Sequence, residues 1–202
     1  MNRAGACRMA SVAVRSRDPI EMNSDLYPRV LGEAWWTLAE SIRRAHAIDR
    51  DRHGCFRVAH GTSWLARRLV CWSCLPREAK AAKVRLRITS EASGQRWERH
   101  FDDETFTTKQ WTDGGSLVER FGSWELCFDL RVEEKALRYV QRGARLCLGA
   151  FRLRVPLAWA PLVSAKETSD GPQRVLVVVT VKLPVVGSLI AYDGHLDVGE
   201  PA

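Results

Sequence analysis

From residue 80 onward, apolar and polar side chains alternate with a period of two, and this alternation limits the possible folds more than any other feature of the chain. In the first alternating run, Val84, Leu86 and Ile88 are each flanked by charged or polar residues. Successive side chains of a β-strand point to opposite faces, so the aliphatic side chains share one face and the charged side chains the other. The run therefore predicts a strand that is buried on one face only.

Clusters of turn-forming residues separate the alternating runs at intervals of roughly ten residues, as in successive β-hairpins. The clusters are Ser93-Gly94, Asp102-Asp103, Asp113-Gly114-Gly115, Gly122 and Glu133-Glu134. No helical segment between the strands is long enough for a parallel crossover, so we expect an antiparallel meander of about eight or nine strands. A large twisted sheet avoids exposed edges by closing on itself. The predicted fold class is α+β and mostly antiparallel β: a curved meander sheet or partly closed β-barrel, with two N-terminal helices packed on it.

The later runs differ in how many of their faces are apolar. Residues 126–132 and 151–155 alternate as before, so each of these strands should offer one apolar face. In residues 174–183, Leu176 and Val178 make the normally polar face apolar too, which predicts a strand covered on both faces. The two helices are the expected cover.

Two amphipathic helices are expected before the first long alternating run. Apolar residues from Leu26 to Ile42 recur at spacings of three and four, which predicts one helix over residues 25–46, capped by Ser24. A short strand at residues 55–59 follows. Residues 64–71 then predict a second helix, which ends before Pro76.

The N-terminal segment differs in composition from the rest of the chain. Residues 1–23 are rich in arginine and have no hydrophobic period, so we expect a disordered extension, then a single domain over residues 24–198 and a tail at 199–202. The same arginine-rich start would also fit an organellar transit peptide, or a chain whose translation begins at Met22.

Composition indicates a soluble globular protein. Of the 202 residues, 46% are hydrophobic and 27% charged. No apolar run reaches the roughly 18 residues of a membrane span, and no secretory signal is recognisable, so we expect a cytoplasmic protein. Six cysteines are too few for a disulfide scaffold and should be free thiols. The net charge of +7 favours weak attraction to nucleic acid or anionic lipid, without specificity. The eight tryptophans are scattered rather than gathered in one basic stretch, which disfavours nucleic-acid binding.

Several short sequence phrases occur together and in order along the chain. They are Arg29-Val30-Leu31-Gly32, Gly61-Thr62-Ser63-Trp64-Leu65-Ala66-Arg67, Gln95-Arg96-Trp97-Glu98-Arg99, Val118-Glu119-Arg120-Phe121-Gly122, Leu183-Pro184 with Gly187, and Tyr192 with Gly194. Through them the chain resembles the bacterial domain-of-unknown-function family numbered 4166 over residues 26–198. The resemblance implies a domain that stands alone or follows a nucleotide-binding, oxidoreductase-like region, and hence cytoplasmic work near small-molecule metabolism. It assigns no activity, and the chain departs from the family pattern at Cys71-Trp72-Ser73-Cys74.

The cysteines and histidines form no complete metal site in the sequence. Cys71 and Cys74 have the spacing of a thiolate pair, but a structural zinc needs four ligands and only His53 and Cys55 lie upstream. Zinc deaminases need a glutamate two residues after the histidine, where this chain has Cys55, so deamination is excluded. We expect Cys71 and Cys74 to be buried thiols, and we predict neither a metal nor a cofactor.

His46, His53 and His60 are spaced by seven residues, which would align them on one helical face. Gly54 and Gly61 break any such helix. We expect separate roles, with His46 at a helix end and the other two in loops or at strand ends.

Glu119 and Arg120 are neighbours on a predicted strand, so one of the two side chains must face the apolar interior. A buried charge has to be paired, and Arg142 or Arg145 on a later strand is the expected partner of Glu119. Such a pair is either a structural lock or the polar anchor of a ligand pocket.

No linear catalytic or phosphate-binding motif is present, so no catalytic residue is assigned. The first hypothesis is that the concave sheet binds a small apolar or amphipathic ligand. The candidate ligand-binding residues are Trp64, Arg67, Trp97, Glu119, Arg120, Phe128, Arg142 and Phe151. The alternatives are a non-catalytic regulatory module for an oxidoreductase partner, and an acid/base enzyme that uses Glu119 and a histidine. A cavity of roughly 300 Å³ or more would favour a binder, a filled core with an exposed apolar patch an interaction module, and an open cleft an enzyme.

Overall fold

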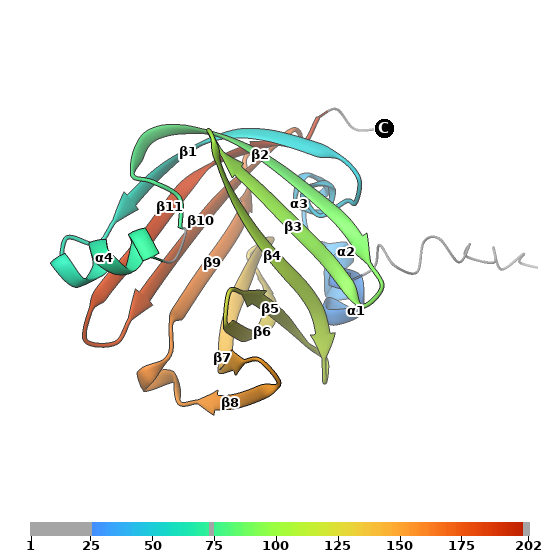
Figure 1. Cartoon of the computed structure of the whole chain (residues 1–202). Coiled ribbons are helices and arrows are strands. Elements are labelled where there is room, and N and C mark those ends of the chain that lie inside the picture. The colour runs from blue at the N-terminus through green and yellow to red at the C-terminus, as the bar shows by residue number, and fades with distance from the viewer. Residues whose placement is uncertain (1–25, 73–74, 200–202) are drawn as a thin grey trace, which may run out of the picture.

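The computed structural model describes residues 26–72 and 75–199, which form a β-barrel with short helices around it (Figure 1). The predictions for Ser24, Cys74, residues 1–23 and the tail beyond residue 199 lie outside the described residues, as does that for the side chain of Cys71. The helices are α1 (Leu26–Leu31), α2 (Ala34–Thr37), α3 (Glu40–Ala45) and α4 (Trp64–Trp72), with one 3-10 turn, η2 (Leu157–Trp159). The strands are β1 (Asp51–His60), β2 (Ala79–Glu91), β3 (Gly94–Phe101), β4 (Glu104–Asp113), β5 (Ser116–Phe121), β6 (Trp124–Glu133), β7 (Ala136–Leu148), β8 (Phe151–Val155), β9 (Leu162–Ser169), β10 (Arg174–Leu183) and β11 (Gly187–Asp197).

The strands close into a ten-stranded antiparallel barrel. Strands β1 to β7 form a meander, β7 pairs with β9, and β11 returns to pair with β1. Strand β8 pairs with the C-terminal part of β7 and lies outside the ring. Each predicted turn cluster falls at a hairpin between paired strands. The predicted fold class is confirmed, with more strands than expected.

The helices take two positions relative to the barrel (Figure 1). Helix α1 contacts β4 and β6, while α3 contacts β9 and β10, so this segment spans one mouth of the barrel. Helix α4 connects β1 to β2 and packs against β11. None of the described helices is long and apolar enough to cross a membrane.

The prediction of one continuous helix over residues 25–46 is wrong. Gly32 ends α1 in the left-handed conformation, with φ of 57°, and its N–H donates to the Pro28 carbonyl at 2.8 Å. Leu38 is extended and ends α2. A straight helix of this length would measure about 33 Å. The two breaks instead bend the segment across the mouth of the barrel.

The predicted cover of residues 174–183 is also wrong. Strand β10 has the predicted bounds, but Val178 on its outer face is 38% exposed, because α4 packs on β11 and β1 instead. Strand β8 also has the predicted bounds, yet residues Phe151 to Arg154 are exposed, because the strand has left the ring. The helix predicted over residues 64–71 is confirmed as α4, which runs to Trp72, and the short strand predicted at 55–59 is part of the longer β1.

Candidate ligand-binding cavity

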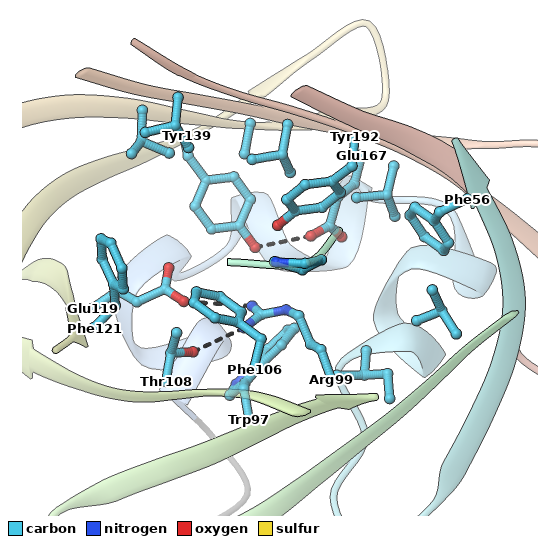
Figure 2. A pocket seen from close by; sticks show the side chains of 18 of the residues that line it. Phe56, Trp97, Arg99, Phe106, Thr108, Glu119, Phe121, Tyr139, Glu167 and Tyr192 are labelled. Carbon is cyan, nitrogen blue, oxygen red and sulfur yellow. Dashed lines mark hydrogen bonds and ion pairs between the residues drawn. The ribbon is translucent and has the colours of Figure 1, made fainter. Parts of the chain in front are cut away.

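The barrel encloses a cavity of about 120 Å³ whose walls are mostly apolar (Figure 2). The aromatic residues that line it are Phe56, Trp97, Phe101, Phe106, Phe121, Phe128, Tyr139 and Tyr192. Polar side chains also reach it, from several strands and from the end of α3: His46, Arg99, Thr108, Gln110, Glu119 and Glu167. An apolar space with a few converging polar groups is the usual form of a small-molecule site.

Arg99 of β3 projects into the cavity above two aromatic rings. Its guanidinium carbon lies 4.9 Å from the centroid of the Trp97 ring, and its Nη1 donates to Thr108 Oγ1 at 2.9 Å. Its Nη2 lies 3.4 Å from Glu119 Oε1. Burial is the largest single influence and lowers the pKa of Arg99, but the negative charge of Glu119, together with the smaller effects of Tyr192, Tyr27 and Tyr139, outweighs burial and raises it. The guanidinium therefore stays charged inside the barrel.

Glu167 of β9 forms a second polar group with Tyr139 and His46. Tyr139 Oη donates to Glu167 Oε1 at 3.0 Å, and His46 Nε2 lies 3.5 Å from Glu167 Oε2. His46 Nδ1 lies 2.9 Å from the Ile42 carbonyl, which can only accept, so Nδ1 carries a proton. A second proton, on Nε2, would be shared with the carboxylate. Burial raises the pKa of Glu167, but the charge of His46 and the hydrogen bonds from His46 and Tyr139 outweigh burial and lower it.

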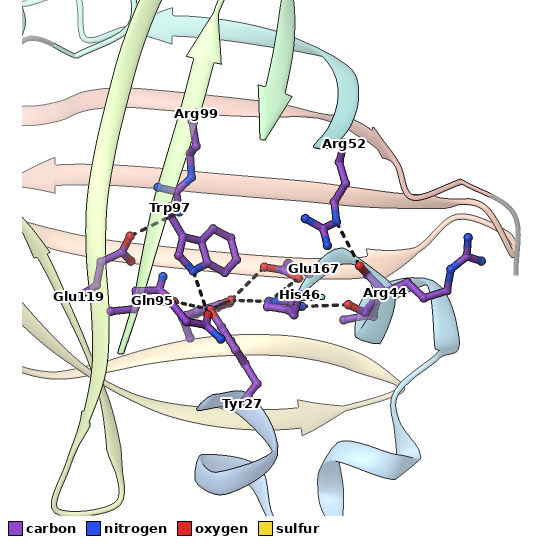
Figure 3. A network of polar contacts seen from close by, with 12 residues as sticks. Tyr27, Arg44, His46, Arg52, Gln95, Trp97, Arg99, Glu119 and Glu167 are labelled. Carbon is purple, nitrogen blue, oxygen red and sulfur yellow. Dashed lines mark hydrogen bonds and ion pairs between the residues drawn. The ribbon is translucent and has the colours of Figure 1, made fainter. Parts of the chain in front are cut away.

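Tyr27 of α1 closes the mouth of the barrel over these groups (Figure 3). Its Oη lies 2.9 Å from Gln110 Oε1 and 3.0 Å from Tyr139 Oη, and its ring centroid lies 4.0 Å from that of His46. Burial and the charge of Glu167 raise the pKa values of Tyr27 and Tyr139 well above 10, so both hydroxyls keep their protons. The helical segment thus covers the mouth of the barrel and supplies two polar side chains, Tyr27 and His46, to the cavity region.

Tyr192 of β11 differs from the other two tyrosines in having an unused hydroxyl. Figure 2 shows its oxygen pointing into the cavity, and within residues 26–72 and 75–199 it forms no hydrogen bond. Burial raises the pKa of Tyr192, so this hydroxyl also keeps its proton. It is therefore a donor available to a ligand.

A comparison with known families places this geometry in context. The family model of a domain of unknown function, DUF4166, matches residues 38–196. The chain belongs to this family. The match confirms the resemblance seen in the sequence and covers all eleven strands up to Leu196 of β11. No curated protein and no solved structure matches the chain.

Three of the predicted ligand-binding residues line the cavity of the DUF4166 domain, namely Trp97, Glu119 and Phe128. Glu119 faces inward as expected, but its partner is Arg99 rather than Arg142 or Arg145. Both of those arginines form ion pairs away from the cavity, Arg142 with Asp129 and Arg145 with Asp113. Arg99 instead shares the inner face with Glu119, and only β4 lies between their strands.

The other predicted residues lie outside the cavity of the DUF4166 domain. Trp64 and Arg67 are exposed on α4, because the buried face of that helix carries Ala66 and Val70 instead. Arg120 follows the inward-facing Glu119 and so points outward, towards Glu125. Phe151 is exposed on β8, which has left the ring.

The sequence predictions missed the polar residues Arg99, Glu167, Tyr139 and Tyr192, and the role of His46. The sequence could have identified Arg99, because side chains two residues apart on a strand share a face, and Gln95, Trp97 and Arg99 therefore all point inward. His46 does lie at a helix end as expected, but it is buried against the cavity. His53 is exposed in β1, and His60 bonds the Pro76 carbonyl at 2.7 Å, so the three histidines do have separate roles.

No group of three or more histidine, cysteine, aspartate or glutamate side chains suits a metal ion in the part of the chain that the structure describes. Cys55, Cys127 and Cys147 are free thiols.

Proposed function

We propose that the barrel binds one small, uncharged, amphipathic molecule in its cavity. The observation that carries the proposal is the Tyr192 hydroxyl, which points into a mostly apolar cavity without a partner among the described residues. Tyr192 is half-buried, so its hydroxyl is accessible from the cavity. A ligand with a carbonyl or hydroxyl oxygen at this position would accept a hydrogen bond from it, while its apolar body contacts the aromatic walls.

The charges around the cavity support an uncharged ligand. Arg99 is paired with Glu119, and a proton on His46 Nε2 would be paired with Glu167. An anionic ligand would therefore meet no unneutralised cation, and burying an unpaired charge is costly. An uncharged ligand needs no rearrangement of these pairs.

The cavity volume limits the proposal to a compact ligand. The 120 Å³ fall short of the roughly 300 Å³ named above as favouring a binder, so the volume does not support a ligand of drug size. An apolar cavity of about 150 Å³ binds benzene, and the cavity of this barrel is somewhat smaller. The proposed ligand is therefore at most a small single-ring compound, and the proposed location of its binding is the cytoplasm.

The paired His46 and Glu167 support a second candidate, an acid/base enzyme. The two side chains lie 3.5 Å apart beside the cavity, and His46 is oriented by the Ile42 carbonyl. A positioned histidine with a carboxylate is a common proton-transfer pair. In this candidate the pair would be His46 with Glu167, and Glu119 would hold Arg99.

A thermal-shift comparison of three compounds on the same ring tests the binding proposal: benzyl alcohol, benzoate and benzylamine. We expect benzyl alcohol to raise the melting temperature most, and Tyr192→Phe to remove that advantage. Trp159→Phe, which changes an exposed ring outside the barrel, is the matched control. Native mass spectrometry of freshly purified protein should show an adduct of roughly 80–150 Da that is lost on denaturation. Tightest binding of benzoate would contradict the proposal and assign Arg99 as an anion site.

A further inference from the structure

The β7–β8 hairpin carries the apolar inner face of the barrel beyond the ring. Leu148 pairs with Phe151 and Leu146 with Leu153 across the hairpin, so these side chains share one face. Within the ring this face is covered by the opposite wall. On the hairpin it is open, and Leu148, Phe151 and Leu153 are 59%, 80% and 63% exposed.

The return to the barrel adds another large apolar side chain. Trp159 of η2 is 75% exposed, and Leu162 at the start of β9 is exposed as well. Figure 1 shows β8 and η2 as a projection from one end of the barrel. We call residues 146–162 the β8 arm. Apolar side chains gathered on a projection, where packing of the barrel does not require them, mark an interaction surface.

Positive charge accompanies the apolar face. Arg152 and Arg154 lie on the other face of β8, and both are exposed. Residues 135–166 contain five arginines, two lysines and no acidic residue. Arg152 Nη2 lies 3.8 Å from Oε1 of the buried Glu125, but Arg120 and Arg145 approach the same carboxylate at 4.0 and 3.8 Å, so one negative charge is shared by three arginines. The surface that the arm presents is therefore apolar and cationic.

We propose that the β8 arm docks the protein on an anionic phospholipid membrane, with the turn between β7 and β8 facing the lipid. Leucine, phenylalanine and tryptophan side chains partition into the boundary between headgroups and acyl chains. Arginines beside them attract anionic headgroups. Nucleic acid would engage the aromatic rings but leave the leucines without a partner, and the charge of the arm excludes a basic protein partner. The proposal does not depend on what the cavity binds.

The spacing along β8 fits this orientation. A strand rises about 3.3 Å per residue, so Arg152 lies about 3 Å and Arg154 about 10 Å behind Phe151 along the strand. When Phe151 and Leu148 reach the acyl boundary, both guanidinium groups lie at the depth of the phosphates. The anionic leaflet of cellular membranes faces the cytoplasm, which agrees with the proposed location.

Co-sedimentation of the full chain with vesicles tests the proposal. One vesicle preparation is phosphatidylcholine alone, and the other contains about 30% phosphatidylserine, a composition that attracts basic segments. We expect at least about tenfold stronger binding to the anionic vesicles, and about a fivefold loss for each arginine removed in Arg152→Gln and Arg154→Gln. The double variant Phe151→Ser/Leu153→Ser should lose binding to both preparations.

Matched controls change apolar side chains that are exposed elsewhere. Trp64→Ser on α4 and Val185→Ser in the β10–β11 turn should bind like the unchanged protein. The proposal is overturned if Phe151→Ser/Leu153→Ser binds like these controls while its thermal unfolding is unchanged. A dimer in native mass spectrometry that the same double variant dissociates would show that a second copy covers the arm, and would also overturn it.

Discussion

Tyr27 and Tyr192 carry the same side chain into the same barrel, but their hydroxyls are differently bonded. Tyr27→Phe would remove the oxygen that bonds Gln110 and Tyr139, and would leave both groups buried with one partner fewer. We expect the free energy of unfolding to fall by about 1–3 kcal/mol. Tyr192→Phe should change it by less than about 0.5 kcal/mol. Urea unfolding followed by tryptophan fluorescence measures both, and equal losses would mean that Tyr192 has a structural partner.

Glu167 should make the free energy of unfolding depend on pH in the acid range. Its pKa is lower in the folded state than the usual 4.5, so its contribution is fully present above about pH 4.5 and is lost as pH falls through the folded pKa. At pH 7 Glu167→Gln should lower the free energy of unfolding by about 3 kcal/mol, because it breaks a buried pair. The difference between variant and unchanged protein should shrink as the pH is lowered below 4.5.

Glu91 provides a control for this pH dependence. Hydrogen bonds from Lys109 and Arg96 lower its pKa too, but it lies at the surface. High salt screens charges at the surface much more than buried ones. One molar sodium chloride should therefore suppress the pH-dependent effect of Glu91→Gln and leave that of Glu167→Gln. Equal suppression of both would show that Glu167 is solvated.

The residues that line the cavity were predictable from the sequence only in part. Alternation within one strand identifies Trp97, Glu119 and Phe128, and the same rule, applied further, identifies Arg99. The sequence could not reveal that Glu119 meets Arg99 rather than Arg142, since that depends on which side chains share the inner face of the closed barrel. His46 reaches the cavity through two breaks in the preceding helices, which local periodicity does not show.

At the scale of elements, Gly32 decides how the N-terminal segment runs. In a continuous helix, Gly32→Ala would stabilise the protein by about 1 kcal/mol. In the structure Gly32 has a φ of 57°, and an added Cβ would meet nothing within 4 Å. Alanine should therefore lower the free energy of unfolding by about 1 kcal/mol through backbone strain alone. The change Gly32→Asn should cost less, because asparagine tolerates this conformation. Thermal unfolding of the two variants decides between the two structures.

The elements that local chemistry specifies were predicted well, and those that depend on packing were not. Strand periodicity and turn residues located the hairpins of β2 to β7, because a hairpin is built from neighbouring residues. The bend of α1 to α3 depends on the width of the barrel mouth. The exposure of β8 depends on the pairing of β7 with β9, which no local pattern encodes.

At the scale of the whole molecule, the barrel is closed by a seam between β1 and β11, where Gly54 and Gly194 allow close approach. A Cβ at Gly194 would lie 2.2 Å from the Cys55 carbonyl oxygen, and one at Gly54 would lie 2.2 Å from that of His195. Each clash is with backbone of the partner strand, so the strands themselves would have to separate. Closure therefore depends on the absence of side chains at these two positions.

Gly194→Ala should lower the free energy of unfolding by about 1–3 kcal/mol or more, because the overpacked seam has no flexible side chain to move. Gly143→Ala in β7 is the matched control: an added Cβ there meets nothing within 4 Å, and its φ is outside the left-handed region. That change should be neutral or stabilise by up to about 1 kcal/mol, because alanine loses less backbone entropy on folding. Hydrogen exchange should show the loss in Gly194→Ala first at the amides of β1 and β11. The argument is contradicted if Gly194→Ala is as stable as Gly143→Ala and its amides in β1 and β11 keep uniform protection. The two strands could then separate without cost, and other strand pairs would set the barrel's circumference.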